Sequence, residues 1–196
     1  PLFFGPSAAF TEYLPQQLAG LRTEHDWEAL RVEVASPLVR PSDPEERAVA
    51  LMVAARIREV WASEERPGEA VLLADHGSPR PAVAAVRDHV AHQVAELLSV
   101  PVQACSMERR PGPEYAFNDP VLEDVLGSPG FAGNVLLSLL FLQPGRHAGR
   151  GGDLDAICQQ AQKSHSRLRV RRTALLADHP AMVPLLAQRL QQALAE

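Results

Sequence analysis

The chain has 196 residues, of which 46% are hydrophobic, and it carries a net charge of −5. This hydrophobic content is enough for a folded core and excludes wholesale disorder, while the negative charge argues against a nucleic-acid partner. No apolar run reaches the roughly 18 residues of a membrane span, and no signal peptide is visible. We therefore expect a cytoplasmic protein without a membrane partner.

Apolar runs and amphipathic patterns alternate along the chain. An apolar strand opens the sequence, a helical pattern covers residues 45–61, and the polar segment 64–69 is typical of a linker. From residue 70 onward the order is β-α-β-α-β-α-β-α, which predicts an α/β fold with a mostly parallel sheet covered on both faces. The predicted strands are 70–75, 100–107, 134–142 and 168–176, and the predicted helices are 81–98, 121–126, 153–163 and a last one from about residue 180.

Short identities recur at a constant offset of 138 positions. Residues 2–3 match residues 140–141, and residues 30–32 match residues 168–170. A helical pattern follows residues 30–32, and another follows residues 168–170. The repeat predicts that residues 1–63 are the second half of one unit, that 64–69 is a linker, and that 70–196 is a complete second unit. The first half of the first unit is then expected upstream of Pro1.

Two histidines each follow an apolar strand. His76 comes directly after the strand at 70–75, and His147 lies in a Gly-rich loop after the strand at 134–142. Because the carboxyl ends of parallel strands meet at one edge of a sheet, we expect both imidazoles at that edge. There they could bind a transition metal or accept protons. Glu108 follows the second predicted strand and would reach the same edge as a third ligand or a proton acceptor.

Other interpretations of these residues stay open. Each histidine alone is compatible with an ordinary loop position, and the Gly-rich loop 145–153 could cradle a phosphate at a helix start. That loop lacks the Gly-Lys-Ser/Thr ending of a P-loop and the glycine spacing of a dinucleotide site. Asp153 is expected to cap the helix that follows, and Cys105 and Cys158 are expected to be reduced, buried thiols. Arginine forks suit carboxylate or phosphate ligands; the candidates are Arg80, Arg146 and Arg150.

The two histidine segments together resemble a known family. Residues 71–78 (VLLADHGS) and 140–148 (LFLQPGRHA) are similar to motifs of the sirohydrochlorin cobaltochelatase and ferrochelatase family. These class II chelatases insert a divalent metal into a tetrapyrrole without ATP. The resemblance implies chelatase-like three-layer αβα units with mostly parallel four-stranded sheets, related by internal duplication. Residues 1–7 resemble a degenerate copy of the second motif.

The resemblance also implies a site and a reaction. His76 and His147 match the family's metal-binding histidines, and Glu108 falls where members have an acidic strand end. The implied activity is insertion of Co²⁺ or Fe²⁺, with Ni²⁺ a further candidate, into a sirohydrochlorin-type tetrapyrrole in cobalamin or sirohaem biosynthesis. The metal is a substrate, and no nucleotide is needed. Arg80, Arg146 and Arg150 would bind the carboxylates of the macrocycle.

Departures from the family pattern leave a second function open. Ala9 stands where the offset of 138 aligns His147, and Pro79 precedes Arg80 where the family usually has arginine directly. The alternative is a diverged, non-catalytic protein that binds a metal or a tetrapyrrole. Phosphate-ester chemistry at the Gly-rich loop is a third interpretation, and homo-oligomer formation is also left open.

The expected dependence on two neutral imidazoles predicts a pH profile. Only the neutral ring can ligate a metal, and free histidine has a pKa of about 6.5. We expect chelatase activity to fall as the pH drops through about 6.5. Initial rates of metal insertion between pH 5 and 8 check this, and a rate that rises toward acid pH would contradict it.

Overall fold

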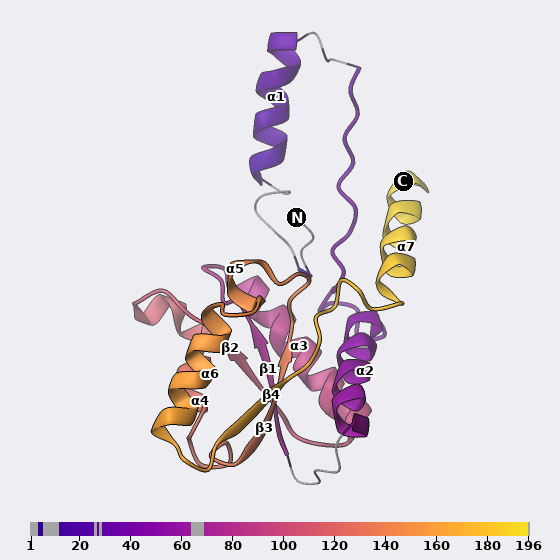
Figure 1. Cartoon of the computed structure of the whole chain (residues 1–196). Coiled ribbons are helices and arrows are strands. Elements are labelled where there is room, and N and C mark those ends of the chain that lie inside the picture. The colour runs from indigo at the N-terminus through magenta and orange to yellow at the C-terminus, as the bar shows by residue number, and fades with distance from the viewer. Residues whose placement is uncertain (1–3, 6–11, 26, 28, 64–68, 196) are drawn as a thin grey trace.

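The centre of the computed structural model is a four-stranded parallel sheet with the strand order β2-β1-β3-β4 (Figure 1). The structure describes residues 4–5, 12–25, 27, 29–63 and 69–195. This sheet confirms the α/β class and the parallel four-stranded arrangement expected from the sequence. The strands are β1 (Ala70–Asp75), β2 (Val102–Ser106), β3 (Asn134–Leu139) and β4 (Arg169–Arg172).

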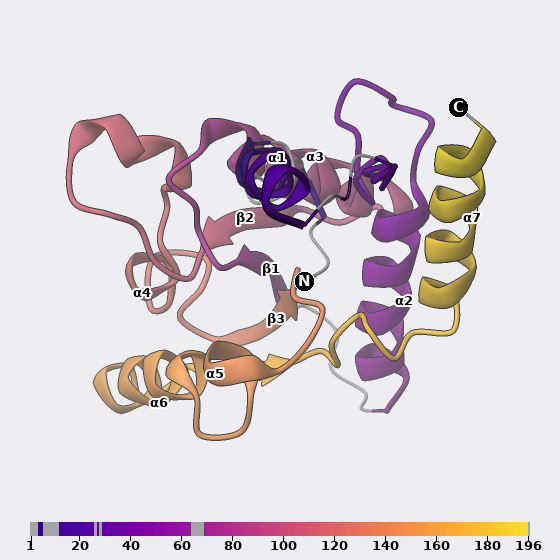
Figure 2. The same ribbon diagram turned by 90° about the horizontal axis from the view of Figure 1, so that it is seen from above.

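Helices cover both faces of the sheet, as the view from above shows (Figure 2). On one face lie α2 (Ala48–Ser63) and α3 (Pro81–Leu98), with α7 (Met182–Ala195) beside α2, and on the other lie α4 (Leu122–Val125) and α6 (Asp153–Ser164). Leu72 and Leu73 are both fully buried, although successive strand residues point to opposite faces. Two hydrophobic cores therefore sandwich the sheet, which explains why its strands are continuous apolar runs.

Helix α3 begins and ends as its sequence dictates. Pro81 is the first helical residue, where its fixed φ is favourable and no N–H is needed. Val86, Val90 and Val94 are buried against the sheet. The helix ends at Leu98, and the cap residue Ser99 has a left-handed φ of 56°.

The strands are shorter than the apolar runs predict. The first matches the prediction, but β3 ends at Leu139 and β4 at Arg172, three and four residues before the predicted ends. Beyond β3 the chain bends toward Pro144, which cannot donate a ladder hydrogen bond. The segment between the second predicted strand and the helix predicted at 121–126 contains a 3₁₀ helix, η2 (Pro113–Asn118), and the Gly-rich loop contains the one-turn helix α5 (Gly145–Ala148).

The N-terminal segment can be compared with the second predicted unit at the offset of 138. Helix α1 (Leu14–His25) extends beyond the edge of the sheet at which α5 lies (Figure 1). At the offset of 138 it corresponds to α6, and α2 occupies the place in the order that α7 holds in the second unit. The counterpart of β4, residues 31–34, is exposed and belongs to no sheet of the described chain.

Packing does not follow the predicted division between the units. Helix α2 comes before the predicted linker, yet Met52, Val53 and Ile57 lie in the same core as Leu73 and Val90. Residues 64–68 of the linker, and residues 1–3 and 6–11 with the degenerate motif, lie outside the described residues. The division into units stays a prediction, and α2 serves as a cover of the second unit's sheet.

In the part of the chain that the structure describes, none of the helices has the length and apolar character needed to cross a membrane.

The packing of α2 predicts a difference between two neighbouring aliphatic side chains. Ile57 is 0% exposed in the core and Leu51 is 50% exposed on the opposite side of the same helix. Ile57→Ala should lower the free energy of unfolding by about 2–5 kcal/mol, whereas Leu51→Ala should change it by less than about 0.5 kcal/mol. Urea unfolding of the whole chain measures both, and equal effects would contradict the role of α2 as part of this core.

Candidate metal centre

His76 and His147 meet at the carboxyl edge of the sheet. His76 follows β1, and His147 lies in α5, which follows the neighbouring strand β3. The two Nε2 atoms are 3.2 Å apart, and the rings stand nearly perpendicular, with centroids 4.4 Å apart at 77°. Two nitrogens bound to one tetrahedral metal ion at about 2.0–2.1 Å would lie roughly 3.3–3.4 Å apart. The spacing of the imidazoles therefore suits one shared metal ion.

A carboxylate orients one of the two rings. Nδ1 of His147 lies 2.6 Å from Oδ2 of Asp153. Because a carboxylate only accepts hydrogen bonds, this contact puts the proton on Nδ1 and leaves the lone pair on Nε2, which faces His76. The expected cap at Asp153 is wrong: Gly152 is the cap residue, Asp153 is the first residue of α6, and the helix has no side-chain cap.

Glu108 reaches the same place from the end of β2. Its backbone N–H donates to the carbonyl oxygen of His76, and its Oε1 lies 3.7 Å from Nε2 of His76. Among the described residues, no group of three or more His, Cys, Asp or Glu side chains is arranged to hold a metal ion. The site thus consists of two close imidazoles with an exposed carboxylate beside them.

The turn after His76 needs a glycine. Gly77 has a φ of +90°, a conformation that favours glycine, and a Cβ there would overlap the carbonyl oxygen of Glu108. Its N–H donates to Oδ1 of Asp75, 3.0 Å away. The turn can therefore lie directly against the end of β2, which brings Glu108 close to His76.

Buried charge lies beneath this turn. Burial raises the pKa of Asp75, and the nearby Ser106 hydroxyl and Arg87 guanidinium oppose that shift. Arg87 is only 2% exposed. Sequence reasoning missed this residue, although a signal existed: Arg87 is four residues after Val83 and three before Val90, so helical spacing puts it on the same side of the helix as these valines.

The three candidate arginines differ in their surroundings. Arg80 is bound by Glu12, with two N–O distances of 2.8 Å, and this pair lowers the pKa of Glu12 and raises that of Arg80. Arg146 is exposed, with Nε 3.9 Å from Asp153, and Arg150 is exposed and has no recorded ion pair within the described residues. Of the three candidates, one arginine is therefore engaged in an ion pair and two face solvent. The sequence pattern did not indicate Glu12 as a partner.

The remaining candidates do not form sites. Cys105 and Cys158 are free and buried as expected, and burial raises their pKa values to about 12 and about 11, so both stay protonated thiols. The start of α6 is filled by its own carboxylates. Asp155 accepts a hydrogen bond from the Gly151 N–H and pairs with Arg172 at 2.5 Å. These negative charges disfavour a phosphate at the Gly-rich loop.

Comparisons with known proteins bear on the family and the fold. Residues 70–193 match the family model described as CbiX. Among solved structures, SirB from Bacillus subtilis with Fe³⁺ is similar, with a TM-score of 0.72 and 16% identity over 98% of this chain and 69% of that chain. The sirohydrochlorin chelatase SirB from Bacillus subtilis subspecies spizizenii in complex with cobalt has a TM-score of 0.67 and 15% identity over 98% and 67%. The search of curated proteins found no match.

Fold and family define the class of protein. A parallel αβα sheet with the SirB fold, matched over most of its length by a chelatase family model, is a metal chelatase. The chain belongs to the CbiX family of tetrapyrrole chelatases, as the two histidine motifs led us to expect.

The close approach at Gly77 predicts a specific sensitivity. Gly77 and Gly130 both have φ of +90°, but a Cβ at Gly130 would meet nothing within 4 Å. Gly130→Ala should cost about 1–2 kcal/mol for the left-handed backbone alone. Gly77→Ala should cost clearly more, because it also forces the turn away from Glu108. Urea unfolding compares the two, and equal losses would show that the close approach is unimportant.

Proposed function

We propose that this chelatase inserts Co²⁺ or Fe²⁺ into a sirohydrochlorin-type tetrapyrrole, in the biosynthesis of cobalamin or sirohaem, and that His76 and His147 deliver the metal. The observation that carries the proposal is the 3.2 Å separation of the two Nε2 atoms at an open sheet edge. The SirB chains of similar fold were solved with Fe³⁺ and with cobalt, which supports a metal substrate of this kind. Imidazole binds Co²⁺, Fe²⁺ and Ni²⁺ alike, so the choice among them is left to the assay.

Delivery requires that the protein releases the metal it binds. Two neutral imidazoles are enough to hold a divalent ion, and they leave its other coordination positions open to the pyrrole nitrogens. As the macrocycle binds the ion, its nitrogens replace His76 and His147. The absence of a third close donor among the described residues suits this transfer, since a fully protein-ligated ion would be released slowly.

The reaction also releases two protons. A divalent ion replaces two pyrrole N–H protons, so the products are the neutral metal–nitrogen core and 2 H⁺. Glu108, with its carboxylate exposed and 3.7 Å from His76, can accept one proton and pass it to water. An imidazole that has just released the metal regains a free lone pair and can accept the other.

Arginines at the edge of the site would bind the carboxylates of the macrocycle. Arg146 and Arg150 are exposed on the α5 side. Arg80 lies four residues after His76 but is already bound by the Glu12 carboxylate. A substrate carboxylate would therefore replace Glu12 at Arg80 and bind by the same two-point geometry.

The direct test is metal insertion by histidine variants. Absorbance changes follow the conversion of sirohydrochlorin with Co²⁺ or Fe²⁺. We expect His76→Ala and His147→Ala each to lower the rate by about a hundredfold or more, because each removes half of the metal-binding pair. His92→Ala is the matched control, since that imidazole is 74% exposed on α3, and it should retain the wild-type rate.

The same assay separates the proposal from its alternative. Full activity in both histidine variants would refute the assignment of the site. A wild-type chain that binds Co²⁺ and sirohydrochlorin but gives no rate above the spontaneous reaction would favour the non-catalytic binding protein.

The Glu12–Arg80 pair predicts an improved substrate affinity in one variant. Glu12→Gln removes the competing charge, so the KM for the tetrapyrrole should fall by up to about fivefold, a modest change because an exposed ion pair is weak. The value of kcat should stay unchanged. Glu24→Gln, an exposed carboxylate on α1, is the control. An unchanged or higher KM for Glu12→Gln would remove Arg80 from the substrate site.

A further inference from the structure

The turn that carries His76 is clamped by a buried side chain from another element. Asn118, at the end of η2, is 0% exposed. Its Nδ2 donates to the carbonyl oxygen of Ser78, and its Oδ1 accepts the N–H of Ser78, both at 2.9 Å. One amide thus satisfies both backbone polar groups of the residue two positions after His76.

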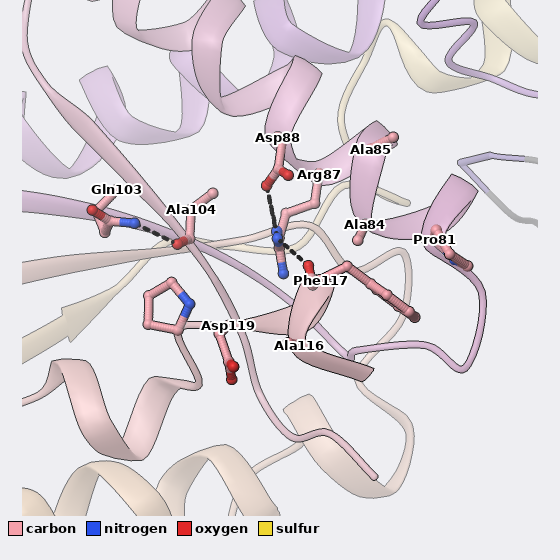
Figure 3. Close-up of a pocket in the computed structure, with 11 residues that line it drawn as sticks. Pro81, Ala84, Ala85, Arg87, Asp88, Gln103, Ala104, Ala116, Phe117 and Asp119 are labelled. Carbon is pink, nitrogen blue, oxygen red and sulfur yellow. Dashed lines mark hydrogen bonds and ion pairs between the residues drawn. The ribbon is translucent and has the colours of Figure 1, made fainter. Parts of the chain in front are cut away.

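Asn118 is itself held in place by further hydrogen bonds. Its Nδ2 also donates to the Tyr115 carbonyl oxygen at 3.1 Å, within η2. Arg87 of α3 donates to the carbonyl oxygens of Phe117 and Asn118 at 3.1 and 3.2 Å, and to the Ser106 hydroxyl at 2.5 Å. The close-up shows Arg87 between Asp88 of its own helix and Phe117 of η2 (Figure 3).

The hollow beside these residues does not belong to the metal site. It has a volume of about 450 Å³ between α3, β2 and η2, and its lining includes Arg87 and Phe117 but neither histidine of the pair (Figure 3). The guanidinium of Arg87 donates its hydrogen bonds to η2, Ser106 and Asp88 and not into the hollow. The contact between α3 and η2 therefore serves to hold η2 in place.

The clamp matters because the two histidines are held differently. His147 has the Asp153 carboxylate at its Nδ1. Nδ1 of His76 has only the carbonyl oxygen of Gly77 at 3.2 Å, so within the described chain its ring depends on the backbone of the turn. That turn passes through a glycine at φ +90°, which has little stiffness of its own. A shift of the turn would move Nε2 of His76 away from His147.

We propose that Asn118 is a positioning residue for metal delivery: by clamping Ser78 it holds His76 at the distance from His147 that a shared metal ion needs. The inference deepens the proposed function and rests on it for the role of the metal. It gives a role to the 3₁₀ helix η2, which lies in the long segment after β2: this helix carries the side chain that positions His76. Asn118 touches neither metal nor macrocycle and acts only through the turn.

The test measures Co²⁺ affinity and turnover of the full chain. Asn118→Ala should raise the Kd for Co²⁺ alone about tenfold, the size typical of residues that orient metal ligands. It should lower kcat while the KM for sirohydrochlorin stays unchanged. Asn118→Asp keeps the acceptor for the Ser78 N–H but loses the donor, so it should give an intermediate Kd. It also carries the test if the alanine variant does not fold.

Gln93→Ala is the matched control. Gln93 is a second buried amide, 3% exposed, and its Nε2 donates to two backbone oxygens, those of Pro44 and Glu46, far from the turn. It should lower the thermal midpoint as Asn118→Ala does while keeping the wild-type Kd. An unchanged Kd in Asn118→Ala, or an equal rise in Gln93→Ala, would overturn the inference. A wild-type chain that binds Co²⁺ through both histidines without inserting it would refute the proposed function alone, because the Kd comparison still tests the clamp.

Discussion

The parallel pairing of β1 with both β2 and β3 is the constraint on which the rest of the structure depends. Asp75 pairs with Ser106, and Ala74 with Leu139, so three chain segments leave the sheet side by side. His76 and Glu108 follow within two residues of their strand ends, and His147 follows β3 in the one-turn helix α5. Two hydrophobic cores fix the register, because a slip by one residue would turn every buried side chain of a strand to the other face.

The proposed metal site combines firmly positioned donors with a small number of them. His147 is oriented by a carboxylate, and His76 by a turn that is held at Asp75, Glu108 and Ser78. The donors themselves are few, and the site lies at an exposed edge. This combination is what metal transfer requires, since the ion has to be placed accurately and then given up to four pyrrole nitrogens.

The parts of this account that depend on local sequence could be predicted. Apolar runs located the strands, and strand order in an α/β fold brought His76 and His147 to one edge. The contacts that tune the site could not be predicted, because each joins elements whose relative position only the folded chain defines. Asp153 resembles a helix cap until α5 brings His147 to it, Glu12 is 68 residues from Arg80, and Asn118 is 40 residues from Ser78. Arg87 is the exception, because a charged residue at helical spacing among valines is visible in the sequence itself.

The central claim is that both imidazoles bind the same metal ion before the macrocycle arrives. X-ray absorption spectroscopy of the whole chain with one equivalent of Co²⁺ and no tetrapyrrole tests it most directly. We expect scattering from two imidazole rings around the cobalt, reduced to one ring in either His76→Ala or His147→Ala. A wild-type spectrum with one imidazole or none, or a spectrum that neither substitution changes, would contradict it.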